Sequence, residues 1–283
     1  MTLAIEVRGL EVRYGSHVAV SGLDLEVRAG EVFGFLGPNG AGKTTTIRAL
    51  LDLLRPDRGR VEVLGEPVRG AGGRLRERLG FLPGDLALFP SLRGSETLDF
   101  FARLYRRPPR RRDEVLDALG FPREALRRRI RTYSTGMRQM IGITVAMQHD
   151  PDLLVLDEPT TGLDPRARGL LELLRVRADE GRTVLFSSHV LAEVERSADR
   201  LGLVKGGRVH LTEEVASLRE RLPKRVRVRR RDGSEEQFLH EGELAPLLAR
   251  LAAEGEALAD LEVRPVDLAE IFRREIRDEE FRA

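Results

Sequence analysis

The chain has 283 residues, of which 41% are hydrophobic and 33% charged, and it contains no cysteine. This length allows one large domain or two unequal ones, and the lack of cysteine excludes disulfides and thiolate zinc sites, as in a reducing cytosolic compartment. Basic residues number 48 and acidic residues 46, a balance that predicts no nucleic-acid partner. The longest charge-free stretches, Val32–Gly42 and Gln139–His149, hold 11 residues. A membrane-spanning helix needs about 20, so we expect none, and the first residues lack the layout of a secretory signal.

The first 65 residues predict short strands followed by a phosphate-loop unit. Ala4–Arg8 and Leu23–Val27 alternate in polarity. The glycines that separate these short strands are Gly9, Gly15, Gly22 and Gly30. Val32–Leu36 is a continuous apolar run, typical of a strand buried on both faces. A glycine-rich loop follows, and Thr44–Leu54 predicts a helix that ends before Pro56.

Further along, strands alternate with helices, which indicates a parallel sheet. The expected elements are helices around 98–105, over Arg111–Leu119 and over Pro165–Glu180, buried strands over Leu153–Leu156 and Thr183–Ser187, and a hairpin over 200–211. A change of character near Leu222 predicts a small β/α domain. Its expected elements are a strand around Val226 and Val228, a turn at Asp232-Gly233, a second strand, a helix over Leu244–Ala253, a strand over Leu261–Arg264 and a helix over Val266–Ile276. We therefore expect two domains, 1–217 and 218–283.

The glycine-rich loop matches the pattern G-x-x-x-x-G-K-[ST] between a strand and a helix. Its residues are Gly37, Pro38, Asn39, Gly40, Ala41, Gly42, Lys43 and Thr44, with Thr45 next to them. In such a loop glycine lets successive N–H groups turn toward phosphate oxygens, and the following helix adds the positive end of its dipole. Lys43 would reach the terminal phosphates and Thr44 would offer its hydroxyl to Mg²⁺.

Two acidic residues follow the Leu153–Leu156 strand, at the edge where open α/β sheets bind ligands. Asp157 would hold Mg²⁺ through water, and Glu158 would polarise the attacking water as a general base. Alone, an apolar run that ends in Asp-Glu also fits an ordinary strand that enters a loop. In a chain that carries the glycine loop, the pair favours the catalytic interpretation.

Together these motifs resemble those of the nucleotide-binding subunits of ABC transporters. Tyr133–Gln139 is similar to the signature sequence of that family, in the variant form of ABC-2-type exporters. Thr161–Asp164 is similar to its D-loop and Ser187–His189 to its switch-histidine segment, while Tyr14 lies where the family stacks an aromatic ring on adenine. The resemblance spans about residues 3–212, and 261–272 is similar to the tail of daunorubicin-type drug-exporter ATPases.

The resemblance implies an α/β fold: a P-loop NTPase cassette with a parallel-sheet core, an antiparallel β subdomain and a helical subdomain at about 85–150, then a small C-terminal α+β domain. It implies ATP and Mg²⁺ as cofactors, and ATP hydrolysis that powers export of an unidentified substrate through a separate transmembrane permease. The chain would then be cytoplasmic and peripheral on the inner face of the cell membrane.

The sequence contains a second candidate phosphate-binding segment, and the resemblance to the family implies a dimer. Ser134 begins an apolar helical run, so its hydroxyl and the N–H groups of Thr135 and Gly136 form an anion site at a helix N-terminus. In the family this segment closes over the glycine loop of another subunit, which implies an ATP-sandwich dimer with a second copy or a paralogue. Asp164 would connect the two sites, and His189 would contact the γ-phosphate. The remaining histidines, which we expect to be structural or solvated, are His17, His149, His210 and His240.

One position departs from the family pattern. Leu79–Asp85 falls where the family has its Q-loop, and Gly84 occupies the place of a glutamine that normally touches Mg²⁺ and the attacking water. Gly84 cannot make that contact, and Asp85 would add a further negative charge beside Asp157 and Glu158. We expect a loop that still acts as a hinge, with altered contact to the metal.

Two other functions fit part of the sequence. A soluble ABC-type ATPase that acts on nucleic acid or ribosomes generally carries two cassettes or coiled-coil or zinc insertions, whereas this sequence has one glycine loop, no heptad run and no cysteine. A P-loop kinase would lack the Tyr133–Gln139 segment. The basic run Lys224–Arg231 alternates with valines and contains no aromatic residue to stack on bases, so it favours a half-buried strand.

Overall fold

The computed structural model describes residues 2–70, 72–163, 167–221, 223–240, 242–253 and 258–265. The chain divides into two compact units, Met1–Thr212 and Glu213–Ala283. The sequence predicted a division after residue 217, and the structure places it a few residues earlier. The reason is that helix α8 (Val215–Arg221) belongs to the second unit. The sequence patterns did not indicate that helix.

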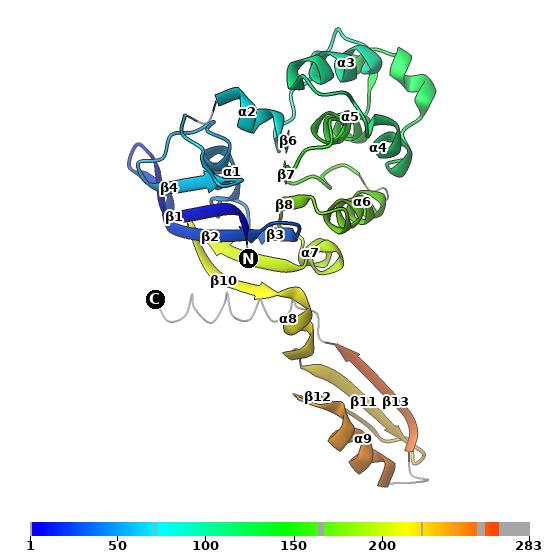
Figure 1. Ribbon diagram of the computed structural model, residues 1–283. Helices are drawn as coiled ribbons and strands as arrows, with labels where there is room; N and C mark the ends of the chain where they lie inside the picture. Colours follow the sequence, from blue (N-terminus) through cyan, green and yellow to red (C-terminus); the bar gives the residue numbers. More distant parts are fainter. Residues whose placement is uncertain are drawn as a thin grey trace. The chain divides into compact units, whose positions relative to one another are not determined.

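A mainly parallel sheet forms the centre of the first unit (Figure 1). Its strand order is β10-β9-β3-β8-β7-β6, and β3 pairs in parallel with β8 and β9, as β7 does with β8 and β6. The strands are β3 (Val32–Leu36), β6 (Leu79–Leu82), β7 (Leu153–Leu156), β8 (Thr183–Ser188), β9 (Arg200–Lys205) and β10 (Arg208–Glu214). The apolar runs that predicted β3, β7 and β8 are confirmed, and every residue in these three strands is buried.

The two faces of this sheet are covered differently. Gly34 of β3 faces helix α7 (Leu191–Ser197), where an added Cβ would lie 2.4 Å from Cγ1 of Val194. Phe33 and Phe35, on the other face, share a core with helix α1 (Lys43–Leu50) and with the antiparallel strands. Helix α6 (Ala167–Asp179) lies beside α7 in Figure 1. The sheet is thus enclosed between helices on one face and α1 with a second sheet on the other.

The second sheet of this unit has the order β2-β1-β4-β5. Its strands are β1 (Leu3–Tyr14), β2 (His17–Arg28), β4 (Arg58–Val63) and β5 (Glu66–Pro67). The prediction of short strands at this end was wrong, because β1 and β2 continue through Gly9 and Gly22, which have φ values of 58° and 67°. The pairing register shifts between Val7 and Leu10, so Gly9 forms an irregularity inside a long strand rather than a turn between two short ones.

Helix α1 ends earlier than the sequence indicates. Its last residue is Leu50 rather than Leu54, because Asp52 adopts a φ of 55° and the N–H groups of Leu53 and Leu54 both bond to the carbonyl of Arg48. The left-handed residue closes the helix before Pro56 is reached.

The helical segment between β6 and β7 contains α3 (Gly94–Tyr105), α4 (Arg112–Ala118) and α5 (Thr135–Met147). Two 3₁₀ turns, Arg123–Arg127 and Ile130–Thr132, connect α4 to α5, and a short helix, α2 (Gly72–Glu77), precedes β6. The last nine residues of α5 are all buried, so this helix forms the centre of the segment. None of the helices in the described part of the chain combines the length and apolar character that crossing a membrane requires.

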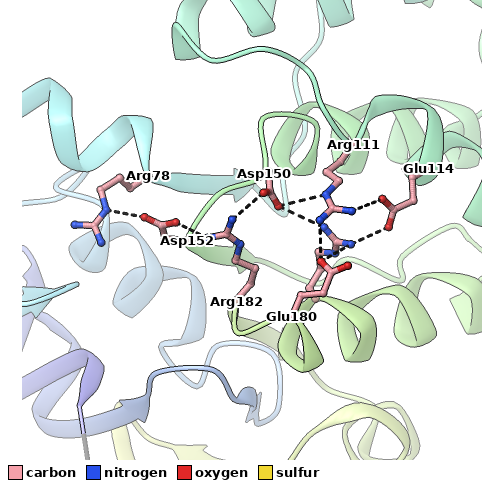
Figure 2. Close-up of polar contacts among 8 residues, drawn as sticks. Arg78, Arg111, Glu114, Asp150, Asp152, Glu180 and Arg182 are labelled. Atoms are coloured by element: carbon pink, nitrogen blue, oxygen red, sulfur yellow. Dashed lines mark hydrogen bonds and ion pairs between the residues drawn. The ribbon is translucent and has the colours of Figure 1, made fainter.

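A network of charges links the helical segment to the sheet (Figure 2). It lies where β7 and β8 begin, since Asp152 and Arg182 directly precede these strands. Arg182 bonds to Asp152 at 2.7 Å and to Asp150 at 2.8 Å, and Arg177 of α6, which is 5% exposed, bonds to Glu114 of α4 at 2.8 Å. The other members are Arg78, Arg111 and Glu180. Arginines thus tie α4, α6 and the amino-terminal edge of the sheet together.

The second unit contains a three-stranded antiparallel sheet of order β12-β11-β13 and helix α9 (Leu244–Ala253). The strands are β11 (Lys224–Arg230), β12 (Glu235–His240) and β13 (Leu258–Pro265). Val226 and Val228 are fully buried against Leu247 and Leu251 of α9, which confirms the half-buried strand predicted for the basic run. On the exposed face, Arg227 pairs with Glu235 at 3.2 Å, so acidic neighbours balance the arginines there. The expected helix over Val266–Ile276 lies outside the described residues.

Candidate functional site

Three loops meet at the carboxyl-terminal edge of the parallel sheet. The glycine loop follows β3, Asp157 and Glu158 follow β7, and His189 follows β8. Because β3 and β7 both pair with β8, the carboxyl ends of all three strands lie side by side. This is the edge where parallel α/β sheets bind ligands.

The glycine loop borders a pocket of about 280 Å³. Gly40 and Gly42 have φ values of 81° and 99°, which glycine adopts without strain. A Cβ added to Gly37 would lie 2.3 Å from the carbonyl oxygen of Val204, and a Cβ added to Gly42 would lie 2.7 Å from the carbonyl oxygen of Ala19. The residues that line the pocket are Tyr14, His17, Ala19, Pro38, Asn39, Gly40, Ala41, Gly42, Lys43, Thr44, Thr45 and Glu158. The loop is therefore built from glycine where the backbone must turn or pack closely, and it frames a space open to a ligand.

Lys43 is the cation of this pocket. Its side chain is 6% exposed, and Nζ lies 2.7 Å from the carbonyl oxygen of Gly37, 3.2 Å from that of Pro38 and 3.2 Å from Oε1 of Glu158. A buried ammonium needs acceptors around it, and here two carbonyls and one carboxylate supply them. The cation is held at the pocket wall, next to the loop whose N–H groups would bind phosphate.

Asp157 is held by two hydroxyl groups. Thr44 donates from Oγ1 to Oδ2 at 2.7 Å, and Ser187 donates from Oγ to Oδ1 at 2.6 Å, while Asp157 itself is 2% exposed. These donors are neutral hydroxyls, so they orient the carboxylate without forming an ion pair with it. Because Thr44 gives its proton to Asp157, its oxygen lone pairs remain for a cation. This hydroxyl–carboxylate pair is the hard oxygen donor set that Mg²⁺ prefers, so the residues present fit that ion.

Glu158 lies between a lysine and a histidine. Its Oε2 is 2.7 Å from Nδ1 of His189 and its Oε1 is 3.2 Å from Nζ of Lys43. Its backbone has a φ of 49°, a left-handed conformation that is strained for a residue other than glycine. The side chains of Glu158 and His189 are 21% and 50% exposed, so this acid remains within reach of water at the pocket rim.

Two side chains with rings line the outer part of the pocket. Tyr14 is 47% exposed there, at the end of β1, as its expected stacking role requires. His17, at the start of β2, lines the same pocket, although no sequence motif surrounds it. The signal that could have found it is its position across a short turn from Tyr14, with which it pairs.

The predicted second anion site is built as a helix start. Ser134 caps α5, and its hydroxyl accepts a hydrogen bond from the N–H of Met137 at 3.2 Å. An added Cβ at Gly136 would lie 2.6 Å from the carbonyl oxygen of Gly162, so this helix start packs closely on the loop after β7. The residues that line the glycine-loop pocket do not include Ser134, Thr135 or Gly136. Asp164 lies outside the described residues.

The Q-loop position lies against Asp157. An added Cβ at Gly84 would be 3.1 Å from Oδ2 of Asp157, so this loop approaches the carboxylate with backbone alone. The side chain of Asp85 is exposed.

The contact of Ser187 with the two acids was not predicted from the sequence. This fully buried residue of β8 bonds to Asp157, and it also accepts a hydrogen bond from the N–H of Glu158 at 2.9 Å. Only the register of β7 against β8 brings the serine to the two acids, and a sequence motif does not carry that register.

Known proteins share this architecture. A family model described as ABC transporter matches residues 20–161. A daunorubicin resistance ATP-binding protein of Streptomyces coeruleorubidus is 44% identical over 211 residues, which cover 73% of this chain and 66% of that protein. A Nod factor export ATP-binding protein of Cupriavidus metallidurans is 36% identical over an alignment that covers 98% of this chain and 100% of that protein.

Solved structures agree with the fold. The ATP binding subunit of an ABC transporter superposes with a TM-score of 0.70 at 28% identity, covering 76% of this chain and 92% of that one. A dimeric bacterial ABC transporter cassette superposes with a TM-score of 0.66 at 20% identity, covering 75% of this chain and 98% of that one. The predicted cassette fold and the resemblance to drug-exporter relatives are confirmed. This chain belongs to the ABC transporter family.

Proposed function

We propose that this chain is the ATP-hydrolysing subunit of an ABC transporter and that it drives export of a substrate through a separate transmembrane permease. The proposal is carried by one arrangement: a phosphate loop, a lysine and two acids meet at one edge of the sheet, with Glu158 between Lys43 and His189. Relatives named as daunorubicin resistance and Nod factor export ATP-binding proteins support export as the purpose.

Each residue of the edge has a part in the reaction. The N–H groups of the glycine loop and Lys43 bind the phosphates, and Thr44 and Asp157 would hold Mg²⁺. When bound, that ion would neutralise part of the charge on the phosphate oxygens. Glu158 accepts the proton of the attacking water. His189, bonded to Glu158 at 2.7 Å, orients that carboxylate and contacts the γ-phosphate.

A second copy or a paralogue completes the site. Ser134 accepts a bond from its own helix and so keeps its proton for a phosphate oxygen, and the N–H groups of Thr135 and Gly136 point out of the helix start. ATP bound between this segment and the glycine loop of the other copy would hold two cassettes together, and loss of the γ-phosphate would release them. Asp164 keeps its proposed place between the two sites, and Tyr14 stacks on adenine.

An exposed apolar patch is the surface that we assign to the permease. Phe89, Phe100 and Leu104 are 50%, 39% and 60% exposed. The rings of Phe89 and Phe100 lie edge to face with centroids 5.5 Å apart, and Leu104 follows Phe100 by one helical turn. The patch belongs to α3 and the loop before it, just after the Gly84 segment, and clustered exposed apolar side chains mark interaction surfaces. Docking there would hold the chain at the cytoplasmic face of the membrane.

Nucleotide-driven dimerisation tests the proposal. Glu158→Gln should bind ATP and hydrolyse it at least about 100-fold more slowly, because the general base is lost. With ATP and Mg²⁺ it should elute as a dimer on gel filtration, and with ADP as a monomer. Ser134→Arg in the Glu158→Gln background should still bind ATP but stay monomeric. Monomer alone in every nucleotide state would refute the two-copy site.

Co-purification tests the permease surface. Tagged wild-type chain should retain a membrane protein from detergent-solubilised cells, and Phe100→Asp should lose it, because an exposed charge replaces an apolar contact. The ATPase rate of the isolated variant should stay at the wild-type level. Equal retention by both chains would place the permease elsewhere.

A further inference from the structure

Ser187 contacts both acids of the site through one hydroxyl group. It lies near the carboxyl end of β8 with no exposed surface. Its Oγ donates to Oδ1 of Asp157 at 2.6 Å and accepts from the N–H of Glu158 at 2.9 Å. We propose that Ser187 is a positioning residue that fixes the metal-binding carboxylate and the catalytic acid relative to each other. This inference rests on the proposed roles of Asp157 and Glu158.

The orientation of Asp157 depends on two hydroxyl donors that come from different places. Thr44 lies in the first turn of α1, directly after the glycine loop, whereas Ser187 belongs to the sheet. On the remaining side, Gly84 offers no side chain, and an added Cβ there would stand 3.1 Å from Oδ2. Of these three neighbours, only Ser187 is a side-chain donor that stays with the rigid sheet. It therefore sets the plane of the carboxylate independently of α1 and of the loop that carries Gly84.

The backbone of Glu158 needs the same hydroxyl. With a φ of 49°, Glu158 has left the strand conformation, so its N–H no longer faces a strand partner and bonds to Ser187 instead. Alanine at 187 would leave two polar groups without their partner, the N–H of Glu158 and Oδ1 of Asp157. Buried polar groups without partners shift or draw in water, and both acids would lose their placement together.

Three variants of the full chain separate positioning from folding. Ser187→Ala removes the hydroxyl, and Ser187→Cys keeps the volume but bonds weakly. Thr183→Val is the matched control, because Thr183 lies at the other end of β8, is 2% exposed and accepts a hydrogen bond from the N–H of Gly30 at 2.9 Å. All three lose one buried hydroxyl from the same strand, but only the first two lose it beside the acids.

We expect kcat to fall about 10- to 100-fold in Ser187→Ala and Ser187→Cys. Affinity for ATP in EDTA should stay unchanged, because the glycine loop is intact. Affinity for Mn²⁺ in the presence of ADP, measured by electron paramagnetic resonance, should fall about 10-fold as the carboxylate loses its orientation. Thr183→Val should change neither kcat nor Mn²⁺ affinity. Ser187→Thr, which keeps a hydroxyl, should bind Mn²⁺ with the wild-type affinity.

The outcomes separate this inference from the proposed function. If Glu158→Gln hydrolyses ATP at the wild-type rate, the assignment of the catalytic acid fails, and the inference fails with it. If Glu158→Gln is slow but the Ser187 variants match Thr183→Val in kcat and Mn²⁺ affinity, the inference alone is overturned. The cysteine variant keeps the test decisive where alanine impairs folding.

Discussion

Both ends of the parallel sheet carry dense charge, but they hold it differently. At the carboxyl-terminal end, Asp157 is held by the neutral hydroxyls of Thr44 and Ser187. At the amino-terminal end, Asp150 and Asp152 lie among arginines, as Figure 2 shows. A neutral donor orients a carboxylate and leaves its charge for a ligand cation, whereas an arginine cancels that charge. For these three aspartates, the partners therefore decide whether the charge of the carboxylate remains available to a ligand.

Loss of the lysine at the first end should give the largest effect. Lys43→Ala should lower ATP turnover by at least about 100-fold, because it removes the cation that we propose binds the terminal phosphates. Phosphate release at saturating ATP measures this, and urea unfolding gives the free energy of unfolding. We expect activity to be lost with little change in that free energy. A stable variant with wild-type turnover would show that Lys43 does not act on phosphate.

The opposite pattern is expected for the arginine at the centre of the second end. Arg177 is 5% exposed and pairs with Glu114 at 2.8 Å, Glu180 at 2.7 Å and Asp150 at 3.4 Å. Arg177→Met should lower the free energy of unfolding by about 3 kcal/mol, since breaking a buried pair leaves carboxylates without their partner. Turnover per folded molecule should remain at the wild-type value. A kcat that falls while the fold is intact would give this network a catalytic part.

Near the amino-terminal end of the sheet, His149 is a buried polar side chain without an arginine partner among the residues that the structure describes. Its Nε2 bonds to the carbonyl of Leu79 at 3.0 Å, its ring stacks on Tyr105 with centroids 3.7 Å apart, and burial lowers its pKa from 6.5 to about 4. Below pH 6.5 the imidazole of His149 is protonated in the unfolded chain, whereas in the folded chain it is not protonated until the pH falls to about 4. This histidine therefore contributes stability above pH 6.5 that is lost as the pH falls toward 4.

The pH dependence gives the third test. Between pH 7 and pH 5 the wild-type free energy of unfolding should fall by about 2 kcal/mol more than that of His149→Gln, which has no proton to gain. Urea unfolding at the two pH values measures the difference. His210→Gln, which removes an exposed imidazole instead, is the control. Equal pH dependence in His149→Gln and wild type would mean that the folded chain accepts the proton.

The stacking role of Tyr14 is expected to be smaller and confined to the nucleotide. Tyr14→Ala should weaken ATP binding by about 1–3 kcal/mol, the range for a base on an aromatic ring. Isothermal titration with ATP measures this loss, and titration with tripolyphosphate is the control, because that ligand has no base. The two affinities should separate in the variant. An equal loss for both ligands would instead mean that Tyr14 supports the phosphate loop.

The sequence predicted best where one local pattern decides the structure. β7 matches its expected bounds, because a continuous apolar run bounded by polar residues allows little else. The prediction of turns at Gly9 and Gly22 was wrong, because glycine occurs both in turns and in irregular strands. The cross-strand pairing between β1 and β2 decides between the two. The lysine and the two acids could be located from motifs. Ser187 lies in the segment similar to the switch-histidine motif, but its contact with the acids could not be predicted, because that contact depends on which strands are neighbours and in what register.

The exposed margin of the arginine network should contribute least. Arg78 bonds to Asp152 at 2.7 Å, but its side chain is 36% exposed, and Asp152 keeps Arg182 at 2.7 Å as a second partner. Arg78→Ala should therefore lower the free energy of unfolding by only about 0.5 kcal/mol, as for solvent-exposed pairs, measured by urea unfolding beside Arg177→Met. Both substitutions remove one arginine from the same network, but Arg177 is more buried and pairs with three carboxylates, whereas Arg78 pairs with Glu66 and Asp152. Equal losses would mean that neither burial nor the number of partners sets the contribution of an arginine to this edge.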